Sequence, residues 1–165
     1  MPLDPNILSE ITGRFRRIRS GLAVGFADAA VADALRGLRG GVWLTDPGTG
    51  ALPFEDEQFE VVVMGGAAVS RESVREANRV LRPEGFLYFA VPERTGAQEG
   101  YTQPEVYRMI REGFDILSVR RPRWWFLRRR GRTLTVCARK KAWHEHRGLI
   151  REGMLTFTPF RKRTR

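Results

Sequence analysis

The chain has 165 residues, of which 42% are hydrophobic and 29% charged, and a formal net charge of +10 at pH 7. This length suits one domain with a sizeable core. The apolar runs are too short to cross a bilayer, and residues 1–6 are not expected to begin a secretory signal. A single cysteine, Cys137, excludes an internal disulfide. These features together predict a cytoplasmic protein.

The basic side chains are concentrated at the C-terminal end. Residues 120–165 contain 16 Lys and Arg but only two acids, a balance of +14, whereas the other 119 residues have a balance of −4. Such asymmetry indicates a polyanionic partner, either nucleic acid or an anionic membrane surface.

The first half of the chain alternates helical and strand-like segments. Apolar residues spaced as on one face of a helix over 7–18 predict an amphipathic N-terminal helix within residues 1–20. The apolar run 21–25 and the run 42–45 predict two short strands. The Ala- and Leu-rich segment 26–38 between them predicts a helix, which the glycines at 40 and 41 end.

The second half repeats this alternation and finishes with two strands close together. Its order predicts an α/β fold with a doubly wound, mostly parallel sheet that ends in an antiparallel hairpin. Cys137 falls in the last strand and is expected in the core. The expected elements are strand 59–64, helix 71–81, strand 86–91, helix 104–112, strand 114–119 and strand 133–138.

Two segments carry a family resemblance. Leu52-Pro-Phe-Glu-Asp-Glu-Gln-Phe59 leads into a buried strand, and Arg79-Val-Leu-Arg-Pro-Glu-Gly85 joins a helix to the next strand. The pair resembles the second half of the class I S-adenosylmethionine-dependent methyltransferases. The resemblance implies one Rossmann-like methyltransferase domain over residues 21–140, followed by a basic tail over 141–165.

The resemblance also implies a methyl-donor site at the carboxyl ends of the first strands, with residues 65–68 facing the acceptor. The family pattern has an acid at Ala23 and glycines at 25, 27 and 29, of which only Gly25 is present, so this turn is either a degenerate donor loop or an ordinary strand-to-helix turn. The family uses one acid for the ribose hydroxyls of the donor and a polar or acidic residue for its adenine, and Asp46 is the only acid available here for both. Five residues separate Asp46 from Leu52, where the family has a helix and a strand. The expected S-adenosylmethionine-binding residues are Gly25, Ala27, Asp28, Asp46, Leu52 and Gly65.

An arginine-rich segment with interleaved aromatic residues lies between the last two strands. Arginine binds phosphate through two parallel hydrogen bonds, and aromatic rings stack on bases. The segment therefore predicts nucleic-acid or other polyanion binding, with a membrane surface, a protein partner or a merely solvated hairpin as alternatives. The predicted polyanion-binding residues are Arg121, Arg123, Trp124, Trp125, Arg128, Arg129, Arg130 and Arg132.

The resulting hypothesis is a methyltransferase-like protein of unknown acceptor that catalyses mainly by proximity, with no catalytic residue assigned. The alternatives are an inactive methyltransferase fold that binds nucleic acid or a protein through its basic end, and a homo-oligomer or partner subunit whose shortened sheet is completed by another chain. His144 and His146 lack further ligands for a metal site. The acids at 55–57 and Glu60 are interpreted as a solvated loop.

Overall fold

The computed structural model describes residues 19–25, 51–65, 68–96, 99–121 and 133–142, together with the backbone of 41–45. The helices expected over 7–18 and 26–38 lie outside the described residues. The same is true of most of the arginine-rich segment and of the tail beyond residue 142.

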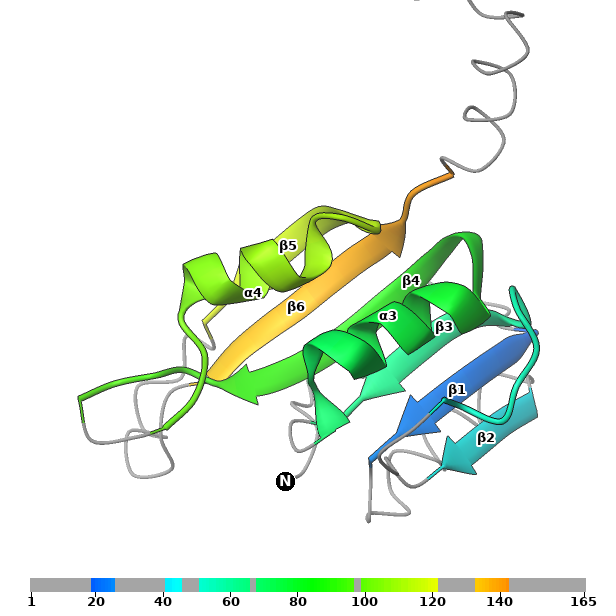
Figure 1. Ribbon diagram of the computed structural model, residues 1–165, viewed down its shortest axis with the longest axis horizontal. Helices are drawn as coiled ribbons and strands as arrows, with labels where there is room; N and C mark the ends of the chain where they lie inside the picture. The colour runs from blue at the N-terminus through cyan, green and yellow to red at the C-terminus, as the bar shows by residue number, and fades with distance from the viewer. Residues whose placement is uncertain are drawn as a thin grey trace, which may run out of the picture.

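The described residues form one six-stranded sheet (Figure 1). Its order is β2-β1-β3-β4-β6-β5, with parallel pairing from β2 to β4 and antiparallel pairing of β6 with both β4 and β5. This confirms the predicted Rossmann-like sheet with an antiparallel hairpin at its end. The strands are β1 (Ser20–Val24), β2 (Gly41–Thr45), β3 (Phe59–Met64), β4 (Leu81–Pro92), β5 (Phe114–Arg120) and β6 (Thr133–Lys140).

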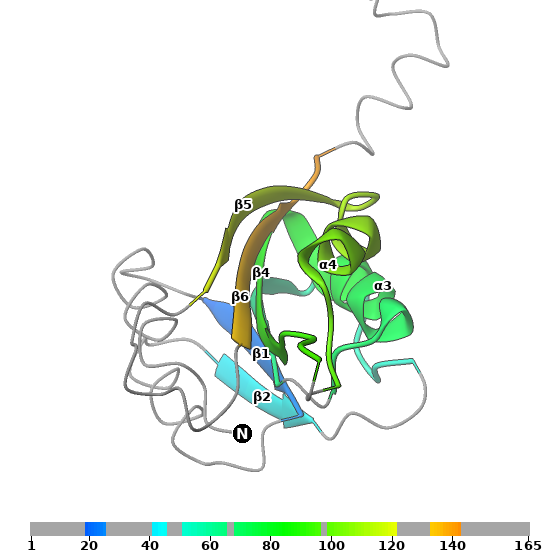
Figure 2. The same cartoon turned by 90° about the vertical axis from the view of Figure 1, so that its left-hand side faces the viewer.

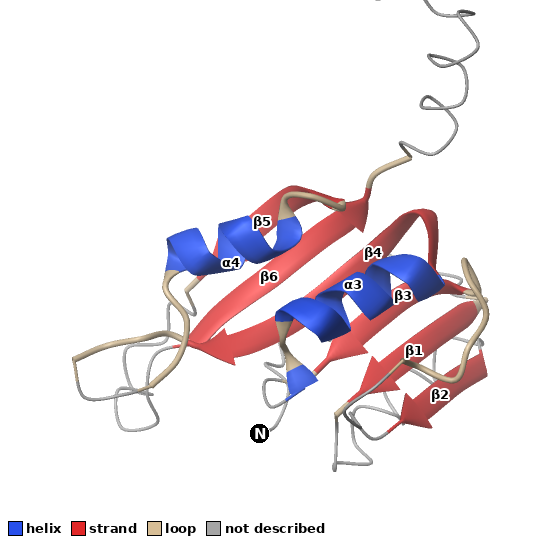
Figure 3. Ribbon diagram, viewed as in Figure 1, coloured by secondary structure: helices blue, strands red, loops and turns tan. Residues whose placement is uncertain are grey.

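Two helices, α3 (Arg71–Val80) and α4 (Gln103–Ile110), lie on the same face of the sheet (Figures 2 and 3). The predicted helix 71–81 begins at an N-cap, Ser70, although the residue three positions on is serine rather than glutamate. The Ser73 hydroxyl nevertheless completes a capping box, because it accepts a hydrogen bond from the Ser70 amide at 2.8 Å. A short hydroxyl can therefore serve where the usual longer side chain is absent.

The core lies between the sheet and these two helices. Alternate residues of β1, β3, β4 and β6 point to this face, which gathers Leu22, Val62, Phe89 and Val136 with Val74 of α3. The opposite face of the central strands is buried as well, through Ala23, Val61, Val63, Tyr88 and Cys137. The continuous apolar runs of β1 and β3 therefore reflect burial on both faces, and a buried strand was predicted for β3.

The first half of the sheet is reduced. β2 pairs with β1 and has no other strand partner in the part of the chain that the structure describes. From β2 the chain passes β1 to reach β3, and residues 51–58 of this connection contain no helix. The expected shortening of the first half is confirmed.

Candidate methyl-donor site and the loop that supports the sheet

The carboxyl ends of β1 and β3 meet at glycines. Val24 pairs with Met64 in the parallel register, and the Gly65 amide donates to the Val24 carbonyl at 2.8 Å. Gly25 has a φ of 73°, a conformation that costs a residue with a Cβ about 1 kcal/mol or more. Two neighbouring strands thus end in residues without side chains, of which Gly25 is half-buried and Gly65 buried.

The loops that follow β3 and β4 are joined by Tyr101. Its hydroxyl donates to the Val69 carbonyl at 2.8 Å, and its amide donates to the Pro92 carbonyl at 2.8 Å. Gly100 is required beside it, because a Cβ there would lie 2.3 Å from the Pro92 carbonyl oxygen. The loop after β4 is therefore held against the loop after β3 at the carboxyl edge of the sheet.

Glu93 occupies the first position after β4 and is buried, with 6% of its surface exposed. Its Oε1 accepts from Arg121 Nε at 2.9 Å and from the Arg121 terminal nitrogen Nη2 at 2.5 Å. The same carboxylate's Oε2 is buried and has no hydrogen-bond partner among the described residues. The ion pair joins the end of β4 to the residue that follows β5, across the start of β6.

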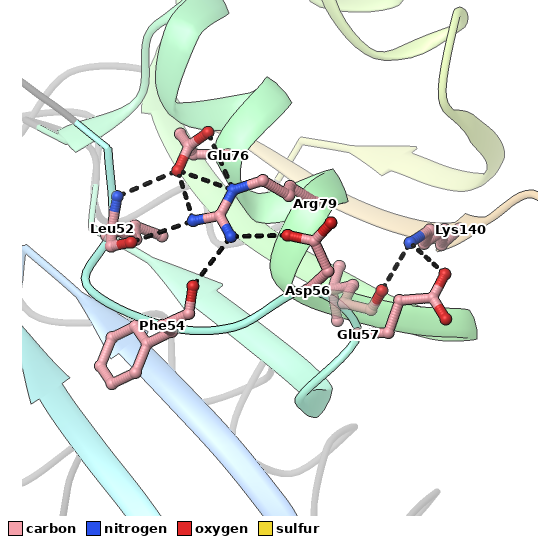
Figure 4. A network of polar contacts seen from close by, with 8 residues as sticks. Leu52, Phe54, Asp56, Glu57, Glu76, Arg79 and Lys140 are labelled. Carbon is pink, nitrogen blue, oxygen red and sulfur yellow. Dashed lines mark hydrogen bonds and ion pairs between the residues drawn. The ribbon is translucent and has the colours of Figure 1, made fainter.

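A second polar network surrounds Arg79 near the end of α3 (Figure 4). The guanidinium donates to the carbonyls of Leu52 and Phe54, at 2.9 and 2.8 Å, and to Asp56 at 2.8 Å. Glu76, one turn earlier, accepts from Arg79 and from the Leu52 amide at 3.0 Å. The two segments that carry the family resemblance therefore bind each other, and their contact fixes the loop that leads into β3.

Charge and hydrogen bonding shift the pKa values of both Glu76 and Arg79. The hydrogen bond from Arg79 is the largest cause that lowers the pKa of Glu76, while partial burial opposes it. The hydrogen bonds from Arg79 to Glu76 and Asp56 raise the pKa of the guanidinium. Glu76 and Arg79 are therefore both charged in the folded chain at neutral pH.

Three of the four acids interpreted as a solvated loop, Asp56, Glu57 and Glu60, form ion pairs. Lys140 is buried, with 2% of its surface exposed, and its Nζ donates to the Leu81 carbonyl at 2.6 Å and to Glu57 at 3.4 Å. Glu60 pairs with Arg82 at 3.3 Å. Together with Asp56, these contacts tie the loop to the starts of β3 and β4 and to the end of β6.

The structure places three of the six predicted donor-binding residues. Gly25 and Gly65 lie together at the ends of β1 and β3, whereas the Leu52 backbone is held by Glu76 and Arg79 and its side chain packs against the core. The other three predicted residues, Ala27, Asp28 and Asp46, lie outside the described residues.

Arg121 was predicted to bind a polyanion, and in the structure its guanidinium forms an ion pair with Glu93. The remaining residues of the polyanion-binding prediction lie outside the described part of the chain, as do His144 and His146. Sequence reasoning missed Glu93 and Tyr101. The only signal was an acidic residue directly after a strongly apolar strand, at the edge where such sheets bind ligands.

The fold matches solved methyltransferase structures, although no protein-family model and no curated protein matches the sequence. A Bacillus halodurans protein described as a candidate methyltransferase aligns with a TM-score of 0.63 and 14% identity, over 83% of this chain and 100% of that one. A SAM-dependent methyltransferase from Methanosarcina mazei aligns with a TM-score of 0.56 and 15% identity, over 86% and 99%. The 1,6-didemethyltoxoflavin-N1-methyltransferase of Burkholderia thailandensis, solved with its substrate and S-adenosylhomocysteine, aligns with 0.56 and 18%, over 82% and 77%.

The chain therefore has the fold of the class I S-adenosylmethionine-dependent methyltransferases. At identities of 14 to 18%, the structural match shows a shared fold, and the chemistry has to be argued from the site. Among the described residues, neither helix is long and apolar enough to span a membrane.

Proposed function

We propose that this chain is an S-adenosylmethionine-dependent methyltransferase whose donor lies across the carboxyl ends of β1, β2 and β3. The observation that carries the proposal is the pair of glycines at adjacent strand ends, Gly25 with its positive φ and Gly65 bonded to Val24, in a sheet of the methyltransferase order. A ligand at this edge follows the general rule for open α/β sheets.

The chemistry of the residues at this edge supports the donor proposal. Gly25 and Gly65 allow its close approach, and Asp46, the residue after β2, is the acid proposed to bind the ribose hydroxyls. Ala27 and Asp28 follow Gly25 in the chain and are proposed to complete the turn. When bound, S-adenosylmethionine supplies an activated methyl group, and the protein's part is to align it with the acceptor.

Isothermal titration with S-adenosylmethionine and S-adenosylhomocysteine tests this proposal. We expect the wild type to bind both and Gly25→Ala to bind neither measurably, because a Cβ at φ 73° both strains the turn and occupies the approach. Gly96→Ala is the matched control, since a Cβ at Gly96 meets no atom within 4 Å. A folded wild-type chain that binds neither compound would contradict the proposed function.

A further inference from the structure

We propose that Glu93 binds the methyl acceptor, and that the acceptor is a nitrogen or oxygen nucleophile that carries a proton. The inference rests on the proposed function for the reaction, but the binding of a hydrogen-bond donor by Glu93 stands on the geometry of the carboxylate alone.

The state of the carboxylate carries the argument. Arg121 satisfies Oε1 with two hydrogen bonds, whereas Oε2 is buried without a partner among the described residues. A buried carboxylate oxygen that accepts no hydrogen bond is costly, and native proteins rarely leave one in that state. The arrangement is explained if Oε2 accepts a hydrogen bond from a ligand.

The position of Glu93 agrees with such a ligand. Met64, the last residue of β3, pairs with Phe89, so β4 continues past the end of β3 and Glu93 lies beyond it. Glu93 also forms a parallel bridge with Tyr101, whose hydroxyl contacts the loop after β3. The carboxylate is thus held at the edge where the proposed donor lies, on backbone fixed from two sides.

The charges select the class of acceptor. The Glu93–Arg121 pair is neutral overall, and Oε2 is the part of it that faces no cation in the described structure. A neutral or cationic N–H or O–H group can donate to Oε2, which is also placed to accept the proton that such a group releases. An acceptor whose nucleophile is a carboxylate would be repelled, and one without a proton would leave Oε2 unsatisfied.

Arg121 is a positioning residue in this proposal. Its planar guanidinium holds Oε1 through two donors, which fixes the plane of the carboxylate and therefore the direction of Oε2. Its own side chain is largely exposed, at 60%, so that the pair is buried on the Glu93 side only.

The test measures binding of matched probes by saturation-transfer NMR, with and without S-adenosylhomocysteine. The probes are aniline, imidazole and phenol, each compared with its analogue that lacks the proton: N,N-dimethylaniline, 1-methylimidazole and anisole. We expect the wild type to prefer the proton-bearing members by about tenfold or more, the size of one hydrogen bond to a charged group. We expect Glu93→Met to lose this preference and Glu93→Gln to reduce it.

The controls separate binding from stability. Glu112→Gln removes another glutamate that pairs with an arginine, at 3.3 Å, but in an exposed position, and should keep the preference. Arg121→Met should reduce the preference and Arg121→Lys should restore part of it, whereas a purely structural ion pair would change only the melting temperature.

Two outcomes would overturn the inference: a wild type that binds none of the probes or shows no preference, or a preference that persists in Glu93→Met. If Glu93→Met does not fold, persistence of the full preference in Glu93→Gln decides against it. Failure to bind S-adenosylhomocysteine would count against the proposed methyltransferase function alone, because the probes are also measured without it.

Discussion

At the scale of single residues, Arg79 organises the loop before β3. One guanidinium contacts two backbone carbonyls and two carboxylates, so its removal leaves several groups without their partners. The residue lies in the segment that first indicated the fold, and its contacts explain why an arginine stands there: a fork of donors can reach several acceptors that a single ammonium group cannot.

Arg79→Met should lower the free energy of unfolding by about 2 kcal/mol, since partly buried carbonyls lose a charged donor. Urea denaturation of both proteins at neutral pH measures the difference. The matched control is Arg82→Met, whose ion pair with Glu60 is more exposed and should change stability by less than about 0.5 kcal/mol. Equal effects of the two substitutions would show that Arg79 does not hold the loop.

Glu76 gives the same network a pH dependence. Because its pKa is lowered in the folded chain, its contribution to stability is full above its ordinary value of 4.5 and is lost as the pH falls through the folded value. We therefore expect Glu76→Gln to be less stable than the wild type at pH 7, and this gap to shrink below pH 4.5. Urea titrations from pH 7 to pH 3 test this, and a gap that stays constant with pH would contradict it.

At the scale of elements, the apolar runs predicted the central strands β1, β3 and β4 because these strands are buried on both faces. The run 59–64 matches β3 residue for residue, and α3 ends within one residue of its expected end. β4 departs from its prediction, because Leu81 already pairs with Phe59, before an irregular stretch in which Glu84 has a φ of 63°. The Pro-Glu-Gly sequence at 83–85 indicates the turn, but it does not indicate that Leu81, before the turn, pairs with Phe59.

The candidate site could be predicted less completely than the elements. Gly25 and Gly65 were predicted because glycines after parallel strands have a recognised position at the ligand-binding edge, and the structure shows only that they lie at adjacent strand ends. The pairing of Glu93 with Arg121 was missed because the two residues are 28 positions apart and meet only through the register of three strands, in which β6 separates β4 from β5. Sequence patterns describe neighbours along one element and give little information about such contacts.

The N-terminus of α4 provides a prediction for an element. The Thr102 hydroxyl accepts from the Glu105 amide, and the Glu105 carboxylate accepts from the Thr102 amide at 2.7 Å. Thr102→Ala should lower the free energy of unfolding by about 1 kcal/mol and increase hydrogen exchange at the adjoining Tyr101 amide. Thr102→Ser keeps the cap and should behave as the wild type; if both variants are equally destabilised, the hydroxyl is not the cause.

At the scale of the whole molecule, the charge asymmetry remains a prediction of polyanion binding. The described part adds one constraint, because Arg121 is already paired with Glu93 and the prediction therefore depends on the later arginines. This surface would serve either an active methyltransferase or an inactive binding module of the same fold.

Binding of single-stranded RNA should weaken steeply with salt, and replacing Arg128, Arg129 and Arg130 by glutamine should reduce the slope of log K against log salt by roughly 2. Fluorescence anisotropy between low and moderate salt measures both. The matched control replaces three exposed arginines of the helical face, Arg71, Arg108 and Arg111, and should leave the slope unchanged. The same slope in both triple variants would show that the arginine-rich segment does not contact RNA.

The Arg79 network and the candidate ligand edge lie at different ends of the sheet. The network ties the loop to the starts of β3 and β4, whereas the candidate ligand edge lies at the opposite ends of these strands. The two segments that carry the family resemblance are thus part of the framework that holds the sheet. The resemblance in these segments therefore reflects how the sheet is held together, and methyl transfer has to be tested at the opposite edge.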